Sequence, residues 1–205
     1  MYIEPCCIDN QLPRLLRQSD GHAAMFQTSG DVTLEHMLEA LMPMVGDRPR
    51  VLTLALPVVD DDVVALLQRY MRLEWVAHLN LITSDTTITT HPSSLTQIGV
   101  PMDRITLSIV TDATTLGLLV FTGASATAAV QGQLESSVRK GLHLYSALYA
   151  PTNTPAIRSL TDPIHALINA RQVDISAEAQ PEAKNKKKSR TPKGQRLESD
   201  TETLT

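Results

Sequence analysis

The sequence predicts a single α/β domain with a mixed, partly parallel sheet flanked by helices, plus a disordered C-terminal tail. An apolar strand, an amphipathic helix and a second apolar strand follow one another between residues 50 and 85. A strand, helix and strand in this order form a βαβ unit with parallel strands. Large apolar residues nearly vanish after residue 172. These two observations predict an N-terminal helical segment at 1–19, an α/β domain at 20–172 and a disordered tail at 173–205.

The composition is that of one aliphatic domain. The 205 residues are 42% hydrophobic, but only 3% are aromatic, so the core must consist mainly of Leu, Val, Ile, Ala and Met. No apolar run is long enough to span a bilayer, which predicts a cytoplasmic protein with no membrane association. Cys6 and Cys7 are adjacent and cannot link distant parts of the chain, so we expect no disulfide framework.

The chain before residue 50 predicts two helices with a strand between them. Residues 10–18 place leucines on one side of a short helix, with Pro13 in its first turn, where a missing N–H is tolerated. Residues 23–30 are expected to form a strand. A second helix lies between an Asp/Thr cap and Gly46 and has apolar residues at helical spacing: Leu34, Met37, Leu38, Leu41 and Val45.

Residues 50–85 supply the central βαβ unit. The run RVLTLALP at 50–57 is almost continuously apolar, which is typical of a strand buried on both faces. Apolar residues then recur with helical spacing from Val63 to Met71, and three aspartates stand at the positive end of the helix dipole. The second strand is VAHLNLITSD at 76–85.

Five further elements are expected after residue 100. Strands are predicted at 104–110, 116–121 and 127–134, and their short connections favour antiparallel neighbours. Residues 135–150 fit either a helix or a strand, and we favour a helix because the larger apolar residues fall on one side. The last helix is expected at 162–172, which begins with Asp-Pro.

Aspartates follow three of the predicted strands: Asp60, Asp61, Asp62, Asp85 and Asp112. Open α/β sheets place ligands at the carboxyl ends of parallel strands, and converging carboxylates there can hold Mg²⁺ for hydrolysis or phosphoryl transfer. Aspartates also cap helices and favour turns. We favour caps and turns, with no cofactor, and keep a metal-dependent hydrolase or phosphotransferase as the alternative.

Other catalytic patterns are incomplete. Gly123-Ala-Ser125-Ala-Thr127 approaches a nucleophile elbow, but a strand is predicted where an elbow requires a helix. The six histidines lack metal-ligand spacing, and no phosphate-binding loop or dinucleotide fingerprint is present. We therefore assign no catalytic residue.

The segment 50–132 resembles a half-repeat of the phospholipase D-like superfamily. In that fold a strand, a helix and a strand precede a hairpin that carries His-x-Lys and an aspartate, and a small-residue stretch follows. The run LLVFTGASAT resembles this last stretch, with Gly123 at the family's glycine and Thr127 close to its polar position.

The resemblance implies a degenerate active site. If Asp112 stands for the family's aspartate, the catalytic histidine and lysine positions fall on Ile105 and Leu107. The family's chemistry needs an imidazole nitrogen to attack phosphorus and a cation to neutralise the phosphoryl oxygens. Isoleucine and leucine supply neither group.

The cations of the chain are unevenly distributed. Residues 1–173 hold 11 Lys+Arg and 16 Asp+Glu, whereas 174–205 hold 7 and 6. The cations of the tail, here called the basic cluster, all lie within 183–196: Lys184, Lys186, Lys187, Lys188, Arg190, Lys193 and Arg196. Such a segment can follow a polyanion such as nucleic acid, or can serve only for solubility.

The preferred function is therefore that of a non-catalytic binding or accessory protein that associates with nucleic acid or a protein partner. The metal-dependent enzyme is one alternative. The other is a structural oligomeric subunit that assembles through an exposed apolar face on Leu142, Tyr145 and Tyr149.

Overall fold

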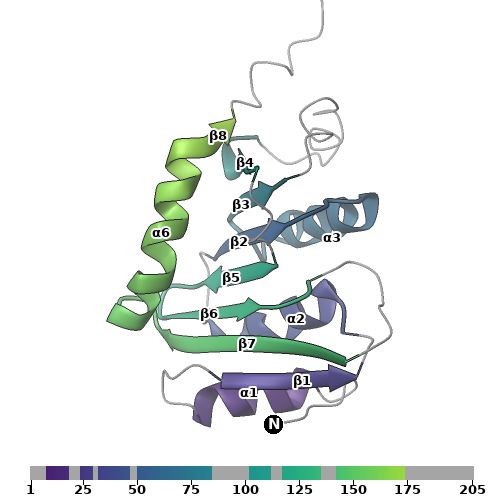
Figure 1. Cartoon of the computed structure of the whole chain (residues 1–205), viewed down its shortest axis with the longest axis vertical. Coiled ribbons are helices and arrows are strands. Elements are labelled where there is room, and N and C mark those ends of the chain that lie inside the picture. Colours follow the sequence, from purple (N-terminus) through teal and green to yellow (C-terminus); the bar gives the residue numbers. More distant parts are fainter. Residues whose placement is uncertain are drawn as a thin grey trace, which may run out of the picture.

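The strands form one mixed sheet in the order β1-β7-β6-β5-β2-β3-β4-β8 (Figure 1). The computed structural model describes residues 8–18, 24–29, 32–46, 50–84, 102–111, 117–134 and 142–173. The strands in this part of the chain are β1 (Ala24–Ser29), β2 (Val51–Leu56), β3 (His78–Thr83), β4 (Ile105–Ile109), β5 (Leu118–Thr122), β6 (Ala126–Gln131), β7 (Leu142–Pro151) and β8 (Gln172–Val173).

Helices cover both faces of this sheet (Figure 1). The α-helices of the described residues are α1 (Ile8–Gln18), α2 (Leu34–Leu41), α3 (Asp61–Arg72) and α6 (Pro155–Arg171). α1, α2 and α3 lie on one face, and α6 runs across the strands on the other. The predicted fold class, an α/β domain with a mixed sheet and flanking helices, is confirmed.

The predicted βαβ unit is present at the centre of the sheet. β2 and β3 pair in parallel, with Val51 opposite His78 and Leu56 opposite Thr83, and α3 connects them. Asp60 caps α3, because its carboxylate accepts a hydrogen bond from the Val63 N–H at 2.9 Å. The prediction of this unit is confirmed, and it rested on clear local sequence patterns for each of the three elements.

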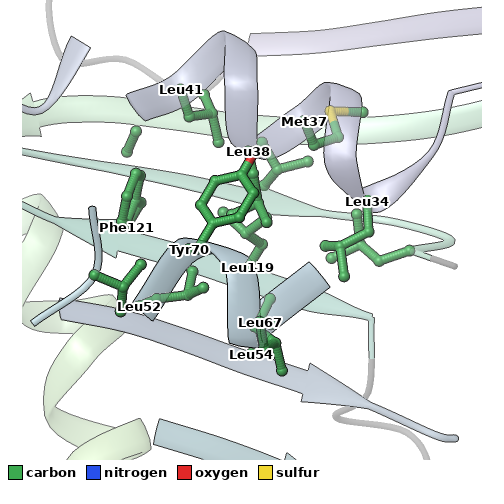
Figure 2. Packing of buried hydrophobic residues seen from close by; sticks show 14 of the residues in the cluster. Leu34, Met37, Leu38, Leu41, Leu52, Leu54, Leu67, Tyr70, Leu119 and Phe121 are labelled. Atoms are coloured by element: carbon green, nitrogen blue, oxygen red, sulfur yellow. The ribbon is translucent and has the colours of Figure 1, made fainter. Parts of the chain in front are cut away.

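The main core lies between the sheet and helices α1 to α3 (Figure 2). Figure 2 shows how side chains from α2, α3 and the sheet meet there: Leu34, Met37, Leu38 and Leu41 from α2, Leu67 and Tyr70 from α3, and Leu52, Leu54, Leu119 and Phe121 from β2 and β5. Each fully buried leucine of this kind contributes about 1.5–3 kcal/mol. Leu12 and Leu16 of α1 belong to the same cluster, so α1 packs as part of the domain.

A correction concerns the strands at 104–110 and 116–121, which were expected to be antiparallel neighbours. β4 pairs in parallel with β3, whereas β5 pairs antiparallel with β2 and β6. Two strands, β2 and β3, therefore separate β4 from β5. The short sequence separation between β4 and β5 was misleading because each finds its partner among earlier strands of the βαβ unit.

A second correction concerns residues 135–150, where we expected a helix. Residues 142–151 form strand β7, which lies between β1 and β6. Burial alternates along it, with Tyr145 and Ala147 in the core and Leu144 largely exposed on the opposite face. The apolar residues fit both periods, and pairing with two other strands decided in favour of the strand. Since Tyr145 is buried and Tyr149 half-buried, the exposed face proposed for oligomer assembly does not exist as expected.

The last helix starts earlier than the expected residue 162. α6 begins at Pro155, and proline is favoured in the first turn of a helix. Asp162 and Pro163, which were read as the start, lie inside the helix.

Candidate functional site

The sheet face under α6 is polar at one end and apolar at the other. At the apolar end, Ala55, Ile82 and Val110 form a small cluster with Ile168 of α6. The other end has a polar group on each of five neighbouring strands: Thr127 on β6, Thr122 on β5, Thr53 on β2, His78 and Asn80 on β3, and Thr106 on β4. On β2 and β3 these positions alternate with the leucines of the main core, so the strand geometry points them to the opposite face.

A cavity of about 190 Å³ lies between this part of the sheet and α6. We call it the threonine cavity, because half of the residues that line it are threonines: Thr53, Thr122, Thr127, Thr152 and Thr161, with Val51, Val120, Ile157, Ile164 and His165. The four α6 residues in this lining, at 157, 161, 164 and 165, share one side of the helix because their spacing is four, seven and eight.

Three threonine hydroxyls are linked through hydrogen bonds beside the cavity. The Thr127 hydroxyl lies 3.4 Å from that of Thr122 and 3.3 Å from that of Thr152. The Thr152 hydroxyl donates to the Gly123 carbonyl at 3.1 Å. These contacts connect β5, β6 and the turn before α6.

Two further side-chain pairs cross the same face. The Asn80 amide donates to the Thr53 hydroxyl oxygen at 3.1 Å, and both residues are buried. His78 Nε2 lies 2.9 Å from the Thr106 hydroxyl. Polar groups that are buried at such a face need partners, and these pairs provide them.

Among the described residues, the linked threonines of the cavity have no hydrogen bond to a basic side chain. A hydroxyl nucleophile needs an adjacent base, and the linked threonines contact only one another and a carbonyl oxygen. His165 is exposed on α6, and none of the hydrogen bonds found among the described residues joins it to a threonine. The lining contains no Asp, Glu, Lys or Arg.

The structure accounts for Asp60 without a metal. Asp60 caps α3, while Asp61 and Asp62 are exposed in its first turn. Asp85 and Asp112 lie outside the described residues. Within the described ranges, no group of three or more His, Cys, Asp or Glu side chains is placed to hold a metal ion.

The positions that the phospholipase D-like resemblance assigns to histidine and lysine are occupied by core residues. Ile105 is 5% exposed and Leu107 is fully buried, and both belong to the main core. The side chains between and after them, Thr106 and Ser108, alternate to the α6 face.

The first three residues of the small-residue run GASAT, 123–125, connect β5 to β6, and its last two belong to β6. A β-carbon on Gly123 would overlap the carbonyl oxygen of Val45, so only glycine permits this approach of the turn to the segment after α2. Strand β6 begins at Ala126, which agrees with our exclusion of a nucleophile elbow.

The basic cluster lies outside the described residues. Several arginines of the domain already have partners: Arg50 donates to the Gly46 carbonyl, Arg104 to the carbonyls of Val76 and Ala77, and Arg69 pairs with Glu35. None of the helices in the described part of the chain has the length and hydropathy needed to cross a bilayer.

Reasoning from sequence missed the threonine cavity. The available signal was a single threonine between leucines in β2 and between alanines in β6, which marks a polar position on one face of each strand. That signal gives no indication that α6 would cover these threonines.

Comparisons with known proteins give little further information. No protein-family model matches the sequence, and no curated protein matches it. Among solved structures, the chain is similar to TrmBL2, described as an archaeal chromatin protein with a novel mode of DNA binding, with a TM-score of 0.40 and 7% identity. The match covers 72% of this chain and 52% of that one, so this chain spans about half of TrmBL2.

Proposed function

We propose that the chain is a non-catalytic accessory protein that binds nucleic acid through the basic cluster. The observation that carries the proposal is the concentration of seven cations and no acid within residues 183–196, after 173 residues that contain a single lysine. Lysines and arginines on such a segment gain affinity by releasing counterions from a phosphate backbone, without reading its sequence.

The domain supports the non-catalytic part of this proposal. Ile105 and Leu107 are core residues, Asp60 is a helix cap, and none of the linked threonine hydroxyls is hydrogen-bonded to a base among the described residues. Because these groups have structural explanations, we favour a binding role for the chain over a catalytic one.

We further propose that residues 50–132 derive from a phospholipase D-like half-repeat that has lost its catalytic pair. The order strand, helix, strand in β2, α3 and β3, and the glycine turn after β5, are consistent with this origin.

The test is fluorescence anisotropy of a labelled DNA duplex and of a labelled single strand with the full-length chain across a salt series. If all seven cations reach phosphates of the duplex, the slope of log K against log salt is about −6, since each neutralised phosphate contributes about −0.9. The test variant replaces the whole basic cluster by glutamine: K184Q, K186Q, K187Q, K188Q, R190Q, K193Q and R196Q.

The control variant removes acids from the same tail, as E198Q, D200N and E202Q. We expect the glutamine variant to lose binding and salt dependence, and the control to bind at least as tightly as the natural chain. Unchanged melting temperatures would show that the domain is intact in both. Equal DNA binding by the glutamine variant contradicts the proposal, and absence of any DNA binding by the natural chain redirects the search to a protein partner.

A further inference from the structure

The hydroxyls of the threonine cavity have hydrogen-bonding capacity left over. The Thr53 oxygen accepts from Asn80, but no described residue accepts the Thr53 hydroxyl proton. Thr161 donates its proton to the Ile157 carbonyl at 3.0 Å, so its oxygen remains an acceptor. Both hydroxyls thus have one partner in the protein and can form a further hydrogen bond with a ligand.

The linked threonines leave a second acceptor at the cavity. Thr152 gives its proton to the Gly123 carbonyl, so Thr127 must donate to Thr152 for their contact to carry a proton. Thr127 has a single hydroxyl proton, so if it donates to Thr152, the proton in its 3.4 Å contact with Thr122 has to come from Thr122. Thr122 has used its proton, and its oxygen is an acceptor at the cavity wall.

The cavity thus offers one donor, on Thr53, and two acceptors, on Thr122 and Thr161. Beside these threonines the lining has aliphatic side chains, Val51 and Val120 from the sheet and Ile157 and Ile164 from α6, and the exposed His165. A ligand that fits must have hydroxyl groups, which both donate and accept, and C–H groups that pack on the aliphatic side chains.

Charge and size restrict the ligand further. An ionised ligand would lose hydration with no Asp, Glu, Lys or Arg in the lining to pair with it, and the one ionisable side chain there, His165, is exposed on α6. A volume of about 190 Å³ corresponds to about six water molecules at about 30 Å³ each. This is smaller than the roughly 300 Å³ or more of sites that hold drug-sized ligands.

We propose that the threonine cavity is a binding site for a small uncharged polyol. The ligand hydroxyls accept from Thr53 and donate to Thr122 and Thr161, and its carbon chain packs against the aliphatic side chains of α6. This site is separate from the basic cluster, so the polyol proposal and the nucleic-acid proposal are tested independently.

The experiment is an NMR titration of the full-length chain labelled at threonine, isoleucine and valine methyl groups. Erythritol is the probe, and 1-butanol, with the same number of carbons, is its apolar counterpart. We expect erythritol to shift the methyl signals of Thr53, Thr122, Thr161 and Ile164 in a saturable way, and 1-butanol to bind less tightly.

Two variants test the hydroxyl contacts. Thr122→Val keeps the shape of the side chain and removes its acceptor, which should weaken erythritol binding about two- to tenfold, the range for one net hydrogen bond. The matched control is Thr28→Val, a buried threonine on β1 with no hydrogen-bond partner among the described residues, which should leave the affinity unchanged.

Thr161→Met provides a test that does not alter the sheet. Its longer side chain from α6 fills the cavity, so erythritol shifts should disappear while the other methyl signals persist. The proposal is overturned if erythritol gives no saturable shift, which leaves a cavity occupied by water alone. It is equally overturned if 1-butanol binds as tightly as erythritol, or if Thr161→Met binds like the natural chain.

Discussion

The Asn80 amide donates a 3.1 Å hydrogen bond to the Thr53 hydroxyl at the centre of the sheet, where β2 and β3 pair in parallel. The two residues face each other directly in the register of these strands. Because both are buried, the bond satisfies an amide that has exchanged water for protein. It also fixes the Thr53 oxygen as an acceptor, which leaves its proton for the threonine cavity.

This hydrogen bond predicts that replacing Thr53 alone lowers the stability more than replacing Thr53 and Asn80 together. Thr53→Val removes the acceptor and leaves the Asn80 amide unsatisfied, so the free energy of unfolding should fall by about 1–3 kcal/mol. Adding Asn80→Leu removes the unsatisfied amide and should restore much of the loss. Urea denaturation of both single variants and the double variant gives the coupling energy. Additive effects, with no recovery in the double variant, would contradict the bond.

Tyr70 predicts a stability change at alkaline pH. Burial, and secondarily the charge of Glu39, raises the pKa of Tyr70 from 10.0 to about 12, against the opposing effect of Arg69. The folded state therefore holds the phenol proton more tightly than the unfolded state does. This contribution to stability is complete below pH 10 and is lost as the pH rises from 10 to 12. The difference in unfolding free energy between the natural chain and Tyr70→Phe should change over that interval and stay constant from pH 7 to 9.

The same substitution should have little effect at neutral pH. The Tyr70 hydroxyl is buried without a hydrogen-bond partner among the described residues, and in Figure 2 it points towards Leu38 of α2. Tyr149→Phe is the control, because its hydroxyl donates to the Met44 carbonyl at 3.2 Å. That variant should lose about 0.5–1.5 kcal/mol. A larger loss in Tyr70→Phe than in Tyr149→Phe would mean that the Tyr70 hydroxyl has a partner.

The central βαβ unit could be predicted from sequence because each of its signals is local. β2 is an apolar run broken only by Thr53, α3 has an aspartate cap and helical spacing, and β3 is again a short strand with mostly apolar buried residues, Leu79, Leu81 and Ile82. Neither strand needs information from distant residues to be recognised. The parallel pairing then follows because a helical crossover is the usual connection between two parallel neighbouring strands.

Strand β7 could not be predicted in this way, because its identity depends on distant partners. Tyr145 and Tyr149, four residues apart, fit the spacing of a helix as well as the alternation of a strand. The decision comes from pairing with β1, more than 100 residues earlier, and with β6. Tertiary contacts override local preference in such segments.

The threonine cavity was beyond sequence reasoning for a related reason. Its hydroxyls come from β2, β5, β6, the turn at Thr152 and α6, and only the sheet order brings these segments together. Reasoning from sequence emphasised aspartates, since charged side chains after strands carry recognisable chemistry. Asp60 instead serves the local structure of α3.

Asp60 gives a test that separates the helix cap from the metal site. Asp60→Ala should lower the free energy of unfolding by about 1 kcal/mol, and Asp60→Ser should retain most of it because serine also caps helices. Asp61→Ala is the control, since Asp61 is exposed and does not cap. Melting temperatures are measured with and without Mg²⁺. A Mg²⁺-dependent stabilisation that both Asp60→Ala and Asp60→Ser abolish would favour the metal-dependent alternative.

The last prediction concerns the two positions that a phospholipase D-like enzyme would use. Introducing Ile105→His with Leu107→Lys should produce no phosphodiesterase activity on bis(4-nitrophenyl) phosphate, and it should lower the free energy of unfolding by more than about 4 kcal/mol. Both side chains lie among the apolar residues of the main core, where burying an ammonium group costs much free energy. The control Val58→Lys, at a position 60% exposed, should change stability by less than about 0.5 kcal/mol. A stable double variant would mean that β4 can turn these residues outwards, and activity in it would restore the catalytic interpretation.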